Sequence, residues 1–335
     1  MLVYLATAFL ATVWLTAAGA TQSRGFHASP SFLGITDREL ILIKPGNGLS
    51  ERPRAESLAE RKNVDTAIDA IDFHYKNNTI IWAEADFAAK NIWKMFLASQ
   101  KQKVLLVYDA GVSHEGLAVD WVNEKLYWIC KPEQSSVEGF SRDRIEVVGL
   151  DGQHRRTLFW QKIVDPKSLV LDPLRAFMYW IDRDENLDTP VIERGSLDGQ
   201  SRQTLVSSSL HLPISLALDP TENLLFWMDM GNDKSVDNRG IFGMNLSSQA
   251  PFVTIQNISI SYTLTVDGNY VYWGDYDGGI LGWRVGTRLH HEGPIKVCNT
   301  TKLDTVVAFS PGRQPSRGWL PFPLRIRCVC LTYTG

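Results

Sequence analysis

Acidic side chains recur along this 335-residue chain at nearly constant spacing, and most of them close a short stretch of small or β-branched residues. Five of these acids are Asp72, Asp120, Asp172, Asp219 and Asp267. Carboxylates of this kind can hold a calcium ion, and calcium beside a histidine supports hydrolytic chemistry. The seven histidines, however, are scattered without any such spacing. An acid that returns in every repeat is typical of a structural role. We therefore expect no catalytic residue, metal or cofactor, and a calcium-dependent hydrolase is the less favoured alternative.

Tryptophan follows the same period as these acids. Trp82, Trp128, Trp180, Trp227 and Trp273 are separated by 46, 52, 47 and 46 residues, and each lies in a strand-like apolar tetrad. One period of this length accommodates four short strands, which is the size of one blade of a β-propeller. The aromatic rings are large enough to fill the space between neighbouring sheets. A chance scatter of tryptophans in a large α/β domain is the alternative.

The acids and the tryptophans belong to different strands of the predicted blade. The stretch that ends in the acid comes first and contains small side chains, which suit the crowded strand nearest the axis. Asp-Gly pairs at 151–152 and 198–199 predict a hairpin turn after the third strand, and the basic residues that follow suit an outer edge. With a degenerate sixth tetrad that ends in Thr36-Asp37, the sequence predicts an all-β, six-bladed propeller of four-stranded antiparallel blades over residues 32–310.

In these motifs the chain resembles the YWTD, or low-density lipoprotein receptor class B, propellers of the lipoprotein receptor-related proteins. The segment Thr305-Val306-Val307-Ala308-Phe309 and the later Arg313-Gln314-Pro315 are similar to the closing strand of that family. The resemblance implies that this strand shares a blade with the amino-terminal strands. Within the family, the chain is most similar to the first propeller of Arrow-type Wnt co-receptors. It departs from that subgroup at Leu212-Pro213-Ile214, where a peptide-binding Trp-Pro-Asn is absent.

The first twenty residues predict export. Residues 2–15 are apolar and Ala18-Gly19-Ala20 suits signal peptidase, so we expect a signal peptide over residues 1–20; a buried helix or a membrane anchor is the alternative. No later apolar stretch is long enough to span a membrane. Four glycosylation sequons agree with a secreted, extracellular glycoprotein. They begin at Asn77, Asn245, Asn257 and Asn299.

Charge and cysteine content exclude other classes. The formal net charge of −3 argues against a nucleic-acid partner, and four cysteines are too few for a disulfide scaffold. Cys130 stands where other tetrads have an acid, and we interpret it as a buried thiol.

Residues 311–335, with Cys328 and Cys330, form a divergent tail that we expect to be poorly ordered. Residues 51–62 are charged and predict a solvated excursion at the blade rim.

Function is expected on the central face, where the short connections into the innermost strands converge. Matching these positions to the family gives the candidate ligand-binding residues Arg38, Asp86, His114, Glu115, Lys167 and Tyr276. They combine both charge signs with one aromatic ring, which suits a protein or peptide loop. Glu115 and Lys167 occupy equivalent positions of adjacent blades and could present opposite charges to one ligand. A solvated loop surface is the alternative for each of them.

These observations predict an extracellular propeller that binds a protein ligand, such as a secreted or truncated Wnt co-receptor-like ectodomain. The expected partner is a Wnt-type ligand, a lipoprotein or a matrix protein. The resemblance also implies dependence on a folding chaperone of the endoplasmic reticulum. A matrix or adhesion component of the nidogen kind is the alternative, because nidogen shares this propeller.

Overall fold

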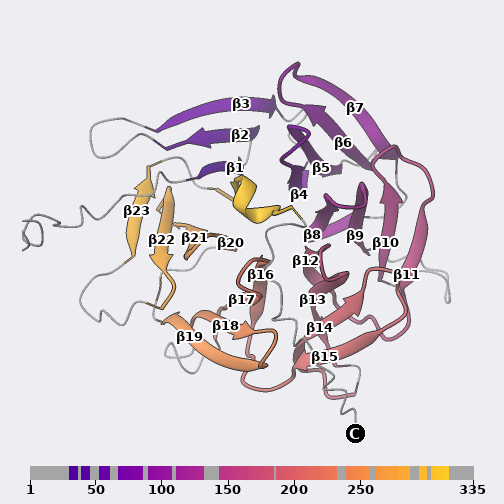
Figure 1. Ribbon diagram of the computed structural model, residues 1–335, viewed down its shortest axis with the longest axis vertical. Helices are drawn as coiled ribbons and strands as arrows, with labels where there is room; N and C mark the ends of the chain where they lie inside the picture. The colour runs from indigo at the N-terminus through magenta and orange to yellow at the C-terminus, as the bar shows by residue number, and fades with distance from the viewer. Residues whose placement is uncertain are drawn as a thin grey trace, which may run out of the picture.

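The computed structural model describes residues 30–36, 39–45, 53–60, 67–85, 90–107, 111–131, 143–184, 186–231, 239–256, 258, 262–275, 277–286, 294–299 and 303–316. These residues form six separate four-stranded antiparallel sheets arranged around one axis, like the blades of a propeller (Figure 1). The predicted fold class is therefore confirmed. The predicted signal peptide, Cys328 and Cys330 lie outside the described residues, and the predicted domain boundaries remain predictions.

Each blade takes four strands from the axis outward. Blade 1 contains β4 (Ala67–His74), β5 (Thr79–Ala85), β6 (Lys90–Phe96) and β7 (Lys101–Val107). Blade 2 contains β8 (Gly111–Asp120), β9 (Lys125–Lys131), β10 (Arg144–Gly149) and β11 (Arg156–Phe159). Blade 3 contains β12 (Lys167–Asp172), β13 (Phe177–Arg183), β14 (Pro190–Ser196) and β15 (Arg202–Val206). Blade 4 contains β16 (Pro213–Asp219), β17 (Leu224–Asp229), β18 (Gly240–Asn245) and β19 (Ala250–Gln256).

The last two blades bring the chain back to its beginning. Blade 5 contains β20 (Leu264–Asp267), β21 (Tyr270–Gly274), β22 (Ile280–Arg284) and β23 (Ile295–Cys298). Blade 6 contains β24 (Thr305–Phe309), β1 (Ser31–Ile35), β2 (Glu39–Lys44) and β3 (Arg54–Glu60). The pairing of Ser31 with Phe309 and of Ile35 with Thr305 closes the ring, as the resemblance implied.

One segment of blade 6 differs from the sequence prediction. Within the stretch 51–62, which was predicted to be a solvated excursion, Arg54–Glu60 is β3, the outer strand of the blade. Its single buried apolar side chain is Leu58, and the charged side chains around it face solvent. An outer strand needs only one apolar contact to be held against its neighbour, and its charges discourage pairing with other sheets. The charge run was therefore interpreted wrongly.

The core lies between the blades, and the tetrad tryptophans form much of it. Trp128 and Trp180 are fully buried, and both lie on the second strand of a blade, as predicted. Between blades 2 and 3, Tyr127 and Ile129 pack with Met178 and Trp180 in one cluster. A ring of this size removes roughly 150–250 Å² from water, so these layers account for much of the stability of the ring.

The innermost strands of neighbouring blades belong to separate sheets and are joined by side chains instead. Ser168 Oγ accepts the N–H of Leu216 at 2.8 Å, and Ser215 Oγ accepts that of Leu264 at 2.9 Å. At other junctions, backbone N–H groups are accepted by side-chain oxygens of Thr263, Thr265 and Asp72. Small polar side chains near the axis fit the narrow space. They also accept backbone N–H groups that have no partner in a β-sheet.

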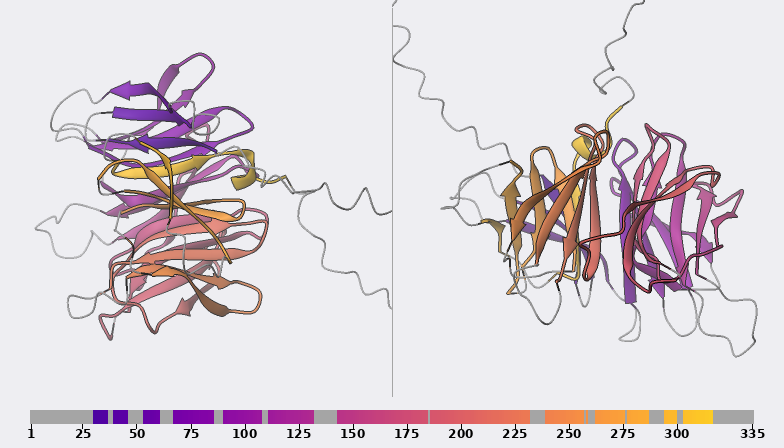
Figure 2. Two further views of the ribbon diagram at one scale, coloured as in Figure 1. Left: turned by 90° about the vertical axis from the view of Figure 1, so that its left-hand side faces the viewer. Right: turned by 90° about the horizontal axis from the view of Figure 1, so that it is seen from below.

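The alternating strand directions give the ring two faces. All six innermost strands begin at one face, which we call the front face, and end at the opposite one, the back face. Figure 2 shows the ring edge-on, with the 3₁₀ turn η2 (Pro311–Arg313) projecting at the back face. Beyond η2, the Gln314 side chain bonds the carbonyl of Phe73 and accepts the N–H of Tyr75 at 2.7 Å. This contact connects the segment after β24 to blade 1.

Candidate functional site

The structure describes only part of the predicted ligand-binding residues, and those that it describes begin innermost strands at the front face. Arg38, Asp86 and Tyr276 lie outside the described residues. His114 and Glu115 lie in β8, while their side chains are not described. Of the six, only Lys167 has a described side chain, at the first position of β12. Whether the six form one binding surface stays a prediction.

The backbone around His114 and Glu115 differs from that of the other blades. Val112 is paired with Cys130, while Leu117 is paired with Trp128, so five steps along β8 correspond to two along β9. The bulges at the same end of β12 and β16 contain a single extra residue. The additional residues of β8 must therefore leave the ladder at the front face. Bulges of this kind re-aim side chains and are common next to functional sites.

Lys167 is part of a charged network centred on Asp165. The carboxylate of Asp165 lies 2.5 Å from Lys131 Nζ, 2.9 Å from Lys167 Nζ and 3.7 Å from Arg183 Nε. Burial alone would raise the pKa of Asp165, but the hydrogen bonds from Lys131 and Lys167 outweigh it and lower the pKa. Lys167 is thus already paired within its own connection, so a ligand that uses it must share it with Asp165.

A buried acid holds this connection in place. Oδ1 of Asp182 accepts the N–H groups of Val164 and Asp165 at 3.1 and 3.0 Å. Oδ2 accepts Trp180 Nε1 at 3.3 Å and Arg202 Nη2 at 3.1 Å. The acid at the end of the tetrad therefore couples the buried tryptophan to the loop that presents Asp165 and Lys167.

The same arrangement recurs in blade 4. Asp229 accepts the N–H groups of His211 and Leu212, each at 2.9 Å, and that of Gly231 at 2.8 Å. Leu212 is thereby held at the front face, before β16, with 44% of its surface exposed. Backbone groups fixed by a buried carboxylate hold their loop rigidly, which limits the entropy lost when a partner binds.

Exposed apolar side chains gather at the front face, and the sequence analysis missed them as a group. They lie in connections before or after strands of blades 2 to 5. They are Trp160, Val164, Leu187, Leu212 and Tyr262. Leu187 is 72% exposed and Trp160 51% exposed. Because they are single residues in loops, no period marks them; their position next to the ends of the predicted strands was the available signal.

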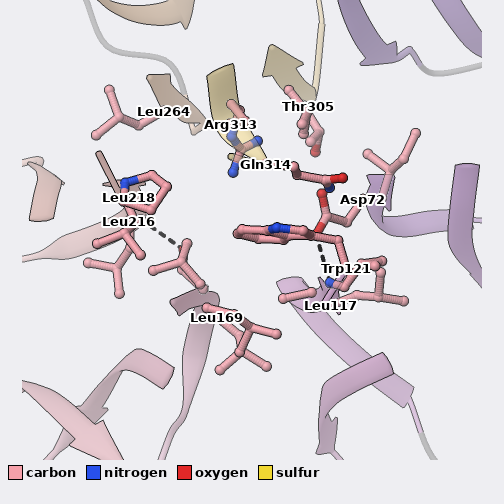
Figure 3. Close-up of a pocket in the computed structure, with 18 of the residues that line it drawn as sticks. Asp72, Leu117, Trp121, Leu169, Leu216, Leu218, Leu264, Thr305, Arg313 and Gln314 are labelled. Atoms are coloured by element: carbon pink, nitrogen blue, oxygen red, sulfur yellow. Dashed lines mark hydrogen bonds between the residues drawn. The ribbon is translucent and has the colours of Figure 1, made fainter. Parts of the chain in front are cut away.

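The central channel is narrow and polar near its back end. It encloses about 60 Å³, and its wall includes Asp72, Ser168, Trp121 and Arg313 (Figure 3). Burial raises the pKa of Asp72, and the nearby Arg313 and the N–H of Val119 oppose this rise. The cavity is much smaller than the roughly 300–1,000 Å³ of a small-molecule site. Among the described residues, no group of three His, Cys, Asp or Glu side chains could hold a metal ion.

Three of the four sequons fall on described residues. Asn77 and Asn299 are exposed, whereas Asn245 is partly buried and its Oδ1 accepts the N–H groups of Ser247 and Ser248 in the turn after β18. Asn257 lies outside the described residues. Glycosylation at the four sites stays a prediction. Cys130 is buried and unbridged, which confirms that interpretation, and Cys298 is likewise buried.

Comparison with known proteins supports the resemblance inferred from the motifs. The model of the low-density lipoprotein receptor repeat class B family matches residues 176–220. The chain is 31% identical over 159 residues to low-density lipoprotein receptor-related protein 5 of Mus musculus, a match that covers 47% of this chain. The human protein of that name gives the same identity and coverage. The match spans 9% of the length of these relatives.

Solved structures agree at the level of the fold. A chain in the crystal structure of a nidogen/laminin complex has a TM-score of 0.68 and 21% identity, with 83% of this chain and 98% of that chain covered. TolB from Acinetobacter baumannii gives a TM-score of 0.58 at 9% identity, over 76% of this chain and 60% of that one. No helix among the described residues is long and apolar enough to cross a bilayer.

Proposed function

We propose, on the premise that this chain carries a low-density lipoprotein receptor class B propeller, that it binds an extracellular protein through its front face. The observation that carries the proposal is that Trp160, Val164, Leu187, Leu212 and Tyr262 are exposed on the same face as the charged network of Asp165. Protein-binding surfaces combine apolar anchors with a polar surround in this way.

The partner class follows from the same surface. Lys131, Lys167 and Arg183 surround one carboxylate, so an acidic ligand loop can compete for the cations while apolar groups cover Leu187 or Trp160. Wnt-type ligands, lipoproteins and matrix proteins all offer folded surfaces of this kind. A matrix role of the nidogen kind is the second candidate, and it is supported by the fold likeness that covers 98% of the nidogen/laminin chain.

The test is surface plasmon resonance on the purified, secreted chain with three analytes: a Wnt-family protein, low-density lipoprotein and laminin. We expect one of them to bind, and Leu187→Asp or Trp160→Ala to weaken that binding by about 30-fold or more, as for an anchor worth about 2 kcal/mol. Val253→Asp is the matched control, since Val253 is exposed on the outer strand β19. Binding that the front-face variants leave unchanged would contradict the proposal.

A further inference from the structure

A second surface lies on the back face, between blades 1 and 2. The outer strands of blade 1 meet the β10–β11 turn here, where Gly152 packs against the backbone of Leu105 and β7 follows the outer edge of the ring (Figure 1). A groove of about 780 Å³ opens at this junction. Its basic lining residues are Lys94, Lys125, His154 and Arg156, and its acidic ones are Glu124 and Asp151. We call it the basic groove.

Two lysines at the basic groove lie close enough to repel each other. Lys94 on β6 is paired directly with Lys103 on β7, and Lys101 lies two positions before Lys103 on the same strand. Like charges opposite each other on neighbouring strands destabilise a sheet. Burial and the charge of Lys103 lower the pKa of Lys94. Its ammonium reaches across to blade 2 and donates to the carbonyl oxygen of Leu150 at 3.1 Å.

The acids of the groove are committed to other groups. Glu124 Oε1 lies 2.9 Å from His74 Nε2 and accepts Asn77 Nδ2 at 3.2 Å. Asp151 Oδ1 accepts the N–H of Gln153 within its own turn, at 2.9 Å. Over the part of the chain that the structure describes, no carboxylate forms an ion pair with Lys94, Lys103 or Lys125. The charges of Glu124 and Asp151 act on Lys94 without a direct contact. The cations of the groove can therefore still pair with an external anion.

We propose that the basic groove binds a sulfated polysaccharide chain. Its lining lysines and arginine come from three strands, β6, β9 and β11, and Lys103 of β7 lies beside Lys94. These cations are spread along the groove instead of converging on one point. A single phosphate would need convergent donors, whereas sulfate groups repeat along a sugar chain and match dispersed lysines as point charges. The volume suits an oligosaccharide segment and is many times that of one anion.

The net charge of the chain indicates where a polyanion could bind. The formal net charge is −3, so no general field attracts polyanions, and the attraction must come from this local cluster. Sulfated polysaccharides are the polyanions expected in the extracellular space that the proposed function assigns to the chain. The groove lies at the back face and the proposed protein-binding surface at the front face. Both partners can therefore bind together.

The test is the affinity of the full secreted chain for immobilised heparin at 0.15 M NaCl, measured by surface plasmon resonance. We expect saturable binding that weakens as salt rises, because screening acts on exposed charges. Lys94→Gln with Lys103→Gln should weaken it at least 10-fold, and so should Lys125→Gln with Arg156→Gln, a pair that leaves the Leu150 contact intact. Lys44→Gln with Lys162→Gln removes the same charge outside the groove and should change it less than twofold.

Three further comparisons decide between sources of the anion and separate this proposal from the previous one. Desulfated heparin, inorganic phosphate and phosphatidylserine vesicles should bind weakly; equal or tighter binding of any of them would overturn the proposal, as would equal loss in the Lys44/Lys162 control. Leu187→Asp should retain heparin binding even if it abolishes protein binding. Asn77→Gln removes any glycan beside the groove, and heparin binding found only in that variant also supports the proposal.

Discussion

Blades 2 and 3 pack their tetrad tryptophans alike but differ in the residue that ends the tetrad. In blade 3, Arg202 lies over the ring of Trp180 at 5.4 Å and bonds Glu193 at 3.1 Å. In blade 2, Arg155 lies over Trp128 at 5.5 Å and bonds Glu146 at 2.9 Å. The tryptophan is fully buried in both blades. The packing of the ring and its cation therefore does not depend on the tetrad acid.

What the acid adds is control of the front face. Asp182 accepts two N–H groups of the connection before β12, along with Trp180 Nε1. Cys130 occupies the equivalent place in blade 2, and Trp128 Nε1 has no partner among the described residues. The same blade carries the wide bulge with His114 and Glu115. The comparison indicates that the aromatic core stabilises the blade, whereas the acid positions the connection before β12.

The largest expected effect comes from the element that both blades share. Trp180→Ala should lower the free energy of unfolding by about 3–5 kcal/mol, because it leaves a large cavity between blades, and it should abolish secretion. Trp128→Ala should behave alike. The measurement is urea denaturation of the purified chain, with exposed Trp160→Ala as the control, which should stay within about 0.5 kcal/mol of wild type. A fully stable, secreted Trp180→Ala chain would refute the blade packing.

A smaller effect should separate the two blades. Asp182→Ala leaves Arg202 Nη2 and two loop N–H groups without the acceptor that Asp182 provides, and we expect the free energy of unfolding to fall by about 3 kcal/mol. Cys130→Ala should cost only about 1 kcal/mol, because it removes one small apolar group. Denaturant titration of both variants measures the difference. If the two substitutions cost the same, the tetrad acid does not have the role inferred here.

Placing the missing acid in blade 2 sharpens the comparison. Cys130→Asp should change the free energy of unfolding by less than about 1 kcal/mol, since pairing with Arg155 offsets the desolvation of the new carboxylate. The informative quantity is the coupling between the two positions. Arg155→Ala should cost at least about 0.5 kcal/mol more in the Cys130→Asp background than in wild type. A double-mutant cycle by denaturation measures this, and a coupling near zero would show that the blades differ in more than one residue.

The smallest effect concerns the front-face network and pH. The pKa of Asp165 is lower in the folded chain than the value of about 3.9 expected when unfolded. Its contribution to stability is therefore complete above that unfolded value and is lost as the pH falls through the lower, folded pKa. Between pH 6 and pH 2.5, wild type should lose more stability than Asp165→Asn does. Parallel pH titrations of the urea midpoint would show this, and identical curves would contradict the paired state of Asp165.

The sequence predicted the ring well and the site only in outline. Trp180 and Asp172 belong to motifs that repeat at a constant spacing, because the equivalent residue packs in the same way in most blades. Such a repeat can be recognised from the sequence. The strand β3 was missed because its charged side chains all face solvent and only Leu58 marks its inner side. Residues that recur at a constant spacing are those that all blades share, and their role here is structural.

The proposed binding surface instead consists of residues that differ between blades. Leu187 and Trp160 are single exposed residues in connections of unequal length, so no repeat reveals them. The pairing of Lys167 with Asp165 depends on how a buried carboxylate folds the loop before β12, which sequence spacing does not specify. Sequence reasoning placed Lys167 at the start of an innermost strand, where the structure has it, but did not predict its ion pair with Asp165.

Ring closure sets the order in which the chain can complete itself during synthesis. The strand β1 pairs with β24, yet β24 is made about 270 residues later, roughly 15–50 s at translation rates of about 5–20 residues per second. Throughout that interval Phe32 and Leu33, which are fully buried in the finished ring, have no inner strand to cover them. The ring is thus open until its last strand arrives. A translation pause before residue 309 would prolong the exposure of this edge to aggregation.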